Sequence, residues 1–233
     1  MRVSSEEELA EAVRGATGSF RVRGGGTRDV GRPVAGAILD VSAISGITLY
    51  EPGALTLVVK AGTPLAEAEA ALAAEGQRLA FEPADWRGLL GTRGEPSVGG
   101  MVAANVSGPR RVQAGACRDA LLGVRFVDGT GAVVKNGGRV MKNVTGYDLV
   151  KLLAGSWGTL GVLVEVSLKV LPAPEAAATL IAGASDHSAA VEAMTMALRS
   201  PYDVTGAAHG PVGTLIRIEG FAQSAAYRAA ASY

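Results

Sequence analysis

The sequence predicts an α+β fold in two parts, and three observations favour this class over a parallel α/β fold. Residues 1–80 show three strand patterns followed by a helix pattern, rather than a regular alternation of strand and helix. A long strand pattern ends at Pro172, and a second proline follows two residues later. Beyond it, the order strand, helix, strand, strand, helix is that of a ferredoxin-like unit without its closing strand. We therefore expect one domain over residues 1–172 and a partial C-terminal segment over residues 175–233.

The chain opens with a short helix and three strands. Ser4 and Glu7 match a capping box for a helix that ends near Gly15. Short runs of apolar residues, some alternating with polar ones, then indicate strands. These predicted strands cover residues 20–22, 37–41 and 56–61.

A second helix follows the third strand, and a long loop follows the helix. Thr63 is its expected N-cap, Pro64 stands in its first turn and Gly76 ends it. Its expected buried side carries Leu65, Ala68 and Leu72. Residues 81–115 contain several prolines and glycines, and a loop of this length inside a compact domain is usually functional or disordered.

Later elements are predicted by turn signals and by helical periodicity. Strands over residues 121–127 and 132–135 flank a glycine-rich turn and form a hairpin. In the C-terminal segment a strand near Thr179 precedes a helix from His187 to Arg199. The predicted inner face of this helix carries Val191, Met194 and Leu198. Two strands over residues 202–204 and 215–218 follow, and then a last helix capped by Ser224.

Three glycine clusters lie at the ends of these elements. The first is Arg23-Gly24-Gly25-Gly26-Thr27-Arg28, which directly follows a strand. The second is Ser97-Val98-Gly99-Gly100, where backbone N–H groups at a helix start would offer an anion site. The third spans residues 155–161. Glycines allow close backbone approach to a ligand, and flanking arginines complement phosphate, so together the clusters indicate a dinucleotide site rather than flexible turns.

The composition excludes several other functions. The formal net charge is zero, which gives no support for nucleic-acid or anionic-membrane binding. No apolar run is long enough for a membrane span, and no signal peptide core follows the N-terminus, so we expect a cytoplasmic protein. The single cysteine, Cys117, excludes an internal disulfide and a cysteine-cluster metal site. The two histidines, His187 and His209, are too few for most zinc or non-haem iron sites unless carboxylates complete them. Neither a G-x-G-x-x-G helix start nor a P-loop motif occurs.

The order of these pieces resembles the FAD-binding domain of the vanillyl-alcohol-oxidase and p-cresol-methylhydroxylase (PCMH) superfamily. The resemblance covers about residues 5–172, and within the superfamily the chain is most similar to the FAD-binding subunits of bacterial glycolate oxidases. Four stretches carry the closer resemblance, and they span residues 81–86, 105–111, 142–149 and 155–158.

The resemblance implies a role for each cluster. Gly24, Gly25, Gly26, Thr27 and Arg28, with Arg23 beside them, would wrap the FAD diphosphate. Ser97, Val98, Gly99 and Gly100 would line the diphosphate and ribityl side, and Asn105 and Gly108 would border the flavin. Gly161 and Val162 would meet the adenine end. For Asn105, a structural amide that satisfies a nearby carbonyl is an equally good interpretation.

Four departures from the superfamily pattern limit these expectations. No histidine stands beside the glycine loop, so we expect non-covalent FAD, and Cys117 is expected to be a small buried filler. Trp157 stands where the catalytic branch typically has glutamate, and it indicates either core packing or a different flavin environment. Both histidines are expected at the surface, so no catalytic base is assigned. Arg110, Arg111 and Arg118 could pair with FAD phosphate, with a substrate carboxylate or, by default, with surface acids.

The resemblance implies the FAD-binding subunit of a glycolate oxidase, in which glycolate becomes glyoxylate and electrons pass through flavin to an acceptor. It implies a larger FAD-containing catalytic subunit and an iron–sulfur subunit as partners, and attachment to the inner membrane only through them. Two alternatives stay open at this point. One is a structural subunit that keeps the flavin fold without electron transfer, and the other is a stand-alone hydroxyacid or alcohol oxidase.

Overall fold

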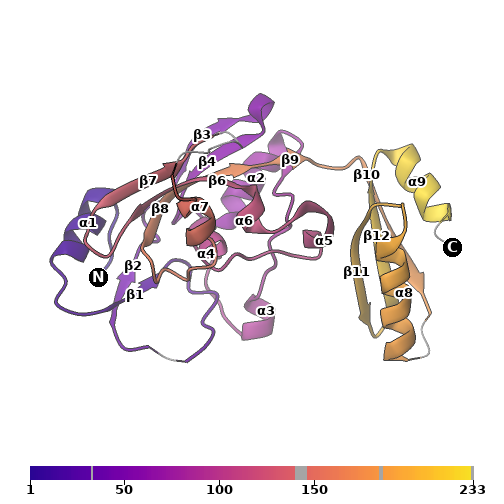
Figure 1. Cartoon of the computed structure of the whole chain (residues 1–233), viewed down its shortest axis with the longest axis horizontal. Coiled ribbons are helices and arrows are strands. Elements are labelled where there is room, and N and C mark those ends of the chain that lie inside the picture. Colours follow the sequence, from indigo (N-terminus) through magenta and orange to yellow (C-terminus); the bar gives the residue numbers. More distant parts are fainter. Residues whose placement is uncertain (33, 140–145, 184–185, 232–233) are drawn as a thin grey trace.

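A central five-stranded antiparallel sheet organises the first part of the chain (Figure 1). The computed structural model describes residues 1–32, 34–139, 146–183 and 186–231. The strands run in the order β3 (Ile47–Glu51), β4 (Thr56–Lys60), β8 (Val162–Lys169), β6 (Leu121–Val127) and β7 (Val133–Gly137). Strands β6 and β7 form the hairpin that the sequence predicts, and the central strand β8 joins it to β3 and β4.

One face of this sheet packs against α2 (Leu65–Ala74) and α4 (Val98–Ala103) to form the main hydrophobic core. Leu72 and Met101 from these helices are fully buried with Leu57 and Val166 of the sheet. Three further helices are short, and they lie in the connections around α4. They are α3 (Arg87–Leu90), α5 (Arg111–Ala114) and α6 (Cys117–Ala120). A fourth short helix, α7 (Leu149–Leu153), packs against β6.

A second core joins the N-terminal residues to the end of the sheet. Helix α1 (Glu6–Arg14) precedes the parallel pair β1 (Phe20–Arg23) and β2 (Ala37–Asp40). Leu9 and Leu39 are fully buried there together with Val127 of β6 and Val164 of β8. Strand β1 therefore ends close to the start of β8, which brings the first and third glycine clusters near each other.

The C-terminal residues form a separate three-stranded antiparallel sheet, here called the three-stranded unit. Its strands run in the order β10 (Ala176–Ala182), β12 (Gly213–Gly220) and β11 (Val204–Gly210). Helices α8 (His187–Arg199) and α9 (Ala222–Ala231) pack on it. This strand order is that of a ferredoxin-like unit with no fourth strand among the described residues, as the sequence predicts. The three-stranded unit comes directly after β9 (Leu171–Pro172), a two-residue strand that pairs with β5 (Gln77–Arg78).

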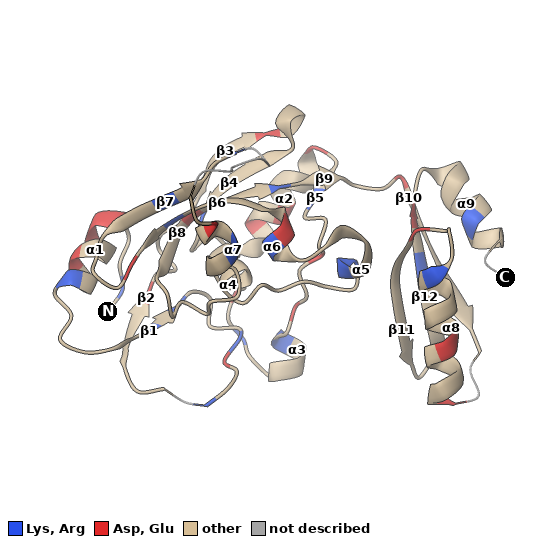
Figure 2. Ribbon diagram, viewed as in Figure 1, with Lys and Arg blue, Asp and Glu red and all other residues tan. Residues whose placement is uncertain are grey.

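Ion pairs hold the three-stranded unit against the first part, and this contact is called the junction below. The Arg217 guanidinium on β12 donates two hydrogen bonds of 2.6 Å each to the carboxylate of Glu82. Glu219, also on β12, pairs with Arg110 and, at 3.3 Å, with Arg78. The side chains of Arg110 and Glu219 are only 4% and 8% exposed. Each pair therefore joins residues of the two parts, and the Arg110–Glu219 pair is the most shielded of them. Figure 2 shows basic and acidic residues in both parts of the chain.

Several local expectations are wrong, and each has a physical reason. The first helix is capped by Ser5, whose hydroxyl accepts a hydrogen bond from Glu8, one residue later than predicted. The Thr63 hydroxyl is used by Gly46 instead of capping α2. Strand β3 was not predicted, because its mixed sequence gives a weak pattern and its partner β4 stabilises it.

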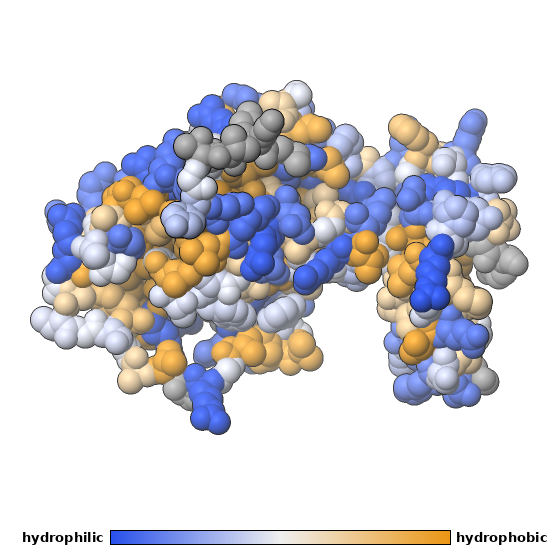
Figure 3. Space-filling view, viewed as in Figure 1, coloured by the Kyte–Doolittle hydropathy of each residue, from blue (hydrophilic) through white to orange (hydrophobic). Residues whose placement is uncertain are grey.

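Three further corrections concern the three-stranded unit. Strand β11 begins at Val204 rather than at Tyr202, and α9 begins before Ser224, where Glu175 accepts from the N–H of Ala222. The predicted inner face of α8 is largely outward: Val191 is 58% and Leu198 43% exposed, while Ala190 is buried. Apolar atoms are accordingly visible over this unit in Figure 3. No described helix is long and apolar enough to span a membrane.

Candidate functional site

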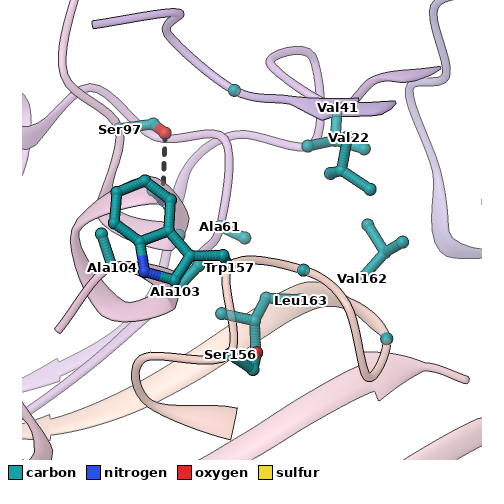
Figure 4. A pocket seen from close by; sticks show the side chains of 15 residues that line it. Val22, Val41, Ala61, Ser97, Ala103, Ala104, Ser156, Trp157, Val162 and Leu163 are labelled. Atoms are coloured by element: carbon teal, nitrogen blue, oxygen red, sulfur yellow. Dashed lines mark hydrogen bonds between the residues drawn. The ribbon is translucent and has the colours of Figure 1, made fainter. Parts of the chain in front are cut away.

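One cavity lies where β1, α4 and the start of β8 meet, and its wall is built almost entirely of small or apolar side chains (Figure 4). It contains about 630 Å³ of space not filled by atoms, part of it open to solvent. This is called the flavin cavity below. Its lining residues are Val22, Gly24, Val41, Ala61, Ser97, Gly99, Gly100, Ala103, Ala104, Ser156, Trp157, Gly158, Gly161, Val162 and Leu163.

All three glycine clusters contribute to this wall. Of the residues that the sequence assigns to FAD, the cavity brings together Gly24, Ser97, Gly99, Gly100, Gly161 and Val162. Their convergence depends on close packing of the chain. A Cβ atom on Gly99 would lie 2.6 Å from that of Ala61, and one on Gly161 would lie 2.7 Å from the Phe126 ring. These glycines therefore let the walls approach one another.

A second cavity shares Val22, Gly24 and Trp157 with the first, and it is strongly basic; it is called the arginine cavity below. It is lined by the loop after β1, with Trp157 and Thr159 opposite. Four arginines and one aspartate carry its charge, and they are Arg21, Arg23, Arg28, Arg32 and Asp29. None of the four guanidinium groups forms an ion pair with another described residue. An anion bound there would meet several donors at once.

The loop after β1 offers backbone donors to this space. Within the described part of the chain, the N–H groups of residues 24–28 have no backbone or side-chain acceptor, although residues 24–26 are only partly exposed and Thr27 is buried. Unsatisfied N–H groups are costly away from water, so such a run indicates a ligand that accepts from them. Gly25 differs from its neighbours: a Cβ there would lie 1.5 Å from the Glu95 carbonyl, so glycine at this position serves chain packing.

The start of α4 offers less than the sequence predicts. Ser97 is its N-cap and accepts from Gly100 N, as expected for the residue at this position. The N–H groups of Val98 and Gly99, however, donate to the carbonyls of Thr63 and Ala61. Because all three N–H groups are used within the chain, this short helix is not the open anion site that was expected. Val98 itself is fully buried beneath the cavity.

Five buried polar side-chain atoms have no hydrogen-bond partner among the described residues. Three belong to the junction residues Arg78, Arg110 and Glu219, and the other two belong to the walls of the two cavities. These two are the Ser156 hydroxyl, in the flavin cavity, and Nε of Arg28, in the arginine cavity. Burial also lowers the pKa of the Arg28 guanidinium, because the cation is partly deprived of water. A ligand that carries an anionic group beside a polar ring would satisfy both atoms. These groups and the glycine-lined cavity therefore fit FAD.

Asn105 and Gly108 lie outside both cavities. Asn105 follows α4 with a left-handed φ of 49°, and its Oδ1 accepts from the N–H of Arg118 at 2.8 Å. The amide is therefore structural, although it binds an N–H rather than the carbonyl considered above. A Cβ on Gly108 would lie 2.2 Å from the carbonyl of Glu82, so this glycine allows close packing at the junction.

The remaining candidates separate into surface and buried groups. Cys117 is fully buried, and burial raises the pKa of its thiol to about 12, which confirms a filler rather than a thiolate. His187 and His209 are exposed and contact each other in the three-stranded unit, with ring centroids 5.5 Å apart. Among the described residues no group of histidine, cysteine, aspartate and glutamate could hold a metal ion.

The three-arginine cluster does not converge on one ligand. Arg110 pairs with Glu219 in a buried position, and Arg118 donates to the Ala154 carbonyl at 2.8 Å. Arg111 is exposed on α5. Of the three arginines that were expected to pair with surface acids, only Arg110 pairs with an acid, and that pair is buried at the junction rather than at the surface.

Several cavity residues were not predicted from the sequence, above all Ser156, Val22 and Ala103. Trp157 was singled out, and the structure excludes core packing for it because 48% of the residue is exposed. Part of the sequence resemblance, residues 142–145, lies outside the described residues.

Comparisons with known proteins agree with this geometry. A family model described as an FAD binding domain matches residues 1–137. The glycolate oxidase subunit GlcE of Escherichia coli K12 is 43% identical over 192 residues, which cover 82% of this chain and 53% of that protein. The D-lactate dehydrogenase of Anaerostipes hadrus is 34% identical over 157 residues, covering 67% of this chain and 31% of that enzyme.

Among solved structures, alkyldihydroxyacetonephosphate synthase superposes with a TM-score of 0.78 at 18% identity, covering 100% of this chain and 49% of that one. This likeness concerns the fold alone. The chain spans about half the length of GlcE and of the synthase. The match of the family model, the shared fold and the glycine-lined cavity show that the chain belongs to the family of FAD-binding domains, with the PCMH-type fold.

Proposed function

We propose that this chain is the FAD-binding part of a glycolate oxidase subunit that works in a complex and oxidises glycolate to glyoxylate. The identity to GlcE supports the assignment to this enzyme. The observation that carries the cofactor role is the run of free N–H groups at residues 24–28 beside the unpartnered Ser156 and Arg28 atoms. When bound, FAD would supply the acceptor for the hydride of the hydroxyacid.

Within this proposal the chain's own residues bind and orient the cofactor. Gly24, Gly26, Thr27 and Arg28 hold the diphosphate through backbone N–H groups and a guanidinium, with Arg23 adding charge. Gly25, Ser97, Val98, Gly99 and Gly100 shape the wall, and Gly161 with Val162 faces the adenine end. Asn105 and Gly108 border the flavin from outside the two cavities. FAD is held non-covalently, since no lining side chain is a histidine or cysteine.

The proposal extends to the assembly. The partners are a larger FAD-containing catalytic subunit and an iron–sulfur subunit, and any contact with the membrane is made through them. Residues 1–172 form the FAD-binding domain and residues 175–233 a partial cap segment. Onward electron transfer takes place in the partners.

A structural role without electron transfer is the second candidate, and one observation favours it. None of the residues that line the flavin cavity, and none of the others assigned to FAD, has a side chain that could act as a general base. This wall can hold a ring system, whereas proton transfer would need a residue from elsewhere in the complex. A stand-alone oxidase is disfavoured for the same reason.

The test compares two versions of the complex co-expressed with its partners. Ala104→Phe fills the flavin cavity in one, and Ala70→Phe, on an exposed position of α2, is the matched control. We expect Ala104→Phe to remove one FAD per copy of this chain and to abolish glycolate-dependent electron transfer. If the complex keeps full activity without this FAD, the structural role is the correct one. If the FAD content of Ala104→Phe is unchanged, the flavin cavity is not the FAD site.

A further inference from the structure

Trp157 is the largest side chain on the wall of the flavin cavity, and its position is unusual for an indole. The residue is 48% exposed, and its backbone has a left-handed φ of 54°, which non-glycine residues rarely adopt. Gly155 and Gly158 on either side also have positive φ. A strained backbone at a large exposed aromatic residue is a common mark of a functional position.

The loop around Trp157 is held firmly on the end of α4. The N–H of Trp157 donates to the Ala103 carbonyl at 2.9 Å, and that of Gly155 donates to Val102 at 3.2 Å. Arg118 fixes the preceding Ala154 carbonyl. The indole is thus presented by an ordered support, and Figure 4 shows it among the lining residues near Ala103 and Ala104, at the C-terminal end of α4.

Trp157 borders both cavities. The wall of the flavin cavity also contains Gly161 and Val162, and that of the arginine cavity also contains Arg23 and Arg28. A ligand with a phosphate beside an aromatic ring would meet guanidinium groups and the indole together. Gly161 and Val162, which face the adenine end in the proposed function, share the cavity wall with Trp157, so the ring nearest Trp157 is the adenine.

We propose that Trp157 is the residue that binds the adenylate half of FAD by ring stacking and so sets the preference for FAD over FMN. This rests on the proposed FAD function and adds a specificity determinant to it. FMN carries the flavin ring and one phosphate but no adenine. Loss of the indole therefore weakens the binding of FAD and leaves the binding of FMN unchanged. Stacking of a base on an aromatic side chain is lost on substitution by alanine at a cost of about tenfold or more in affinity.

The binding test uses intrinsic fluorescence, because the chain has only two tryptophans, Trp86 and Trp157. In a Trp86→Phe background Trp157 is the sole reporter, and we expect ADP and FAD to quench it while FMN does so weakly. FAD and FMN dissociation constants are then measured for Trp157→Ala and Trp157→Phe by flavin fluorescence. We expect FAD binding to weaken about tenfold or more in the alanine variant, to be largely retained in the phenylalanine variant, and FMN binding to be constant. Phe221→Ala, at an exposed residue far along the chain, is the control.

A stability measurement separates this role from a structural one. Trp157→Gly removes the indole and also the left-handed strain, so we expect an unfolding temperature at or above that of the parent together with weaker FAD binding. Equal losses of FAD and FMN affinity would place the flavin ring on Trp157, and unchanged FAD affinity would remove any role; either overturns the inference. A parent chain that binds no FAD at all would instead contradict the proposed function.

Discussion

The flavin cavity and the junction both depend on arginines, and the two sets are in opposite situations. At the junction Arg217, Arg110 and Arg78 each have a carboxylate partner across the interface. Beside the cavity Arg28 has a buried Nε without a partner in the described chain, and its neighbours there form no ion pair with described residues. Nε of Arg78 and of Arg110 also lacks a hydrogen bond, so the two sets differ in their ion pairs. A guanidinium group with a carboxylate partner indicates structure, whereas guanidinium groups without one at a concave wall indicate a ligand.

Breaking the junction should give the largest effect on stability. Arg110→Ala leaves the nearly buried carboxylate of Glu219 without its closest partner, and removing one member of a buried ion pair costs about 3–5 kcal/mol. We expect this loss in denaturant unfolding followed by circular dichroism. The control is Arg111→Ala, on the neighbouring exposed residue, which should change the free energy of unfolding little. Equal, small effects of both variants would show that the junction pair contributes nothing.

The junction should also respond to acid. Hydrogen bonds from Arg217, more than offsetting burial, lower the pKa of Glu82 from its ordinary value of 4.5. A lowered pKa in the folded state means that this stabilisation is complete above pH 4.5 and is lost as the pH falls below it. We expect the stability of the parent to decline more steeply in this range than that of Glu82→Gln. Parallel pH profiles would refute the contribution of the pair.

A cavity variant should show the reverse behaviour. Ser156→Ala removes a buried hydroxyl that has no described partner, so it should leave the free energy of unfolding unchanged or slightly raised. The same variant should weaken FAD binding, because FAD loses the hydrogen bond that the Ser156 hydroxyl would form with it. The matched control is Ser97→Ala, which loses the cap of α4 and should cost about 1 kcal/mol. A large loss of stability in Ser156→Ala would mean that the hydroxyl has a structural partner.

The sequence predicted where helices begin and end better than it predicted which of their side chains are buried. The bounds of α8 and the start of α4 at Ser97 follow from local capping and periodicity. Burial of Val191 and Leu198 did not follow, because helical spacing shows which residues share a face and not what covers that face.

The same limit applies to the site. Glycine runs such as residues 23–28 were visible because glycine itself marks a special backbone. Val22 and Ala103 line the cavity only because distant segments fold onto each other, and nothing in their local sequence distinguishes them from core or loop residues. Ser156 lies inside the third glycine cluster, but the pattern did not show that its hydroxyl faces the cavity. The pairing of Arg110 with Glu219 was hidden for the same reason.

The central claim is that the cavity at β1, α4 and β8 holds FAD non-covalently, and a flavin titration of the purified chain tests it most directly. The parent and Ala70→Phe should bind FAD in one-to-one stoichiometry and release it on acid precipitation, while Ala104→Phe should bind at least about tenfold more weakly. A colourless parent that does not take up FAD, or equal affinity in the parent and in Ala104→Phe, would contradict the account.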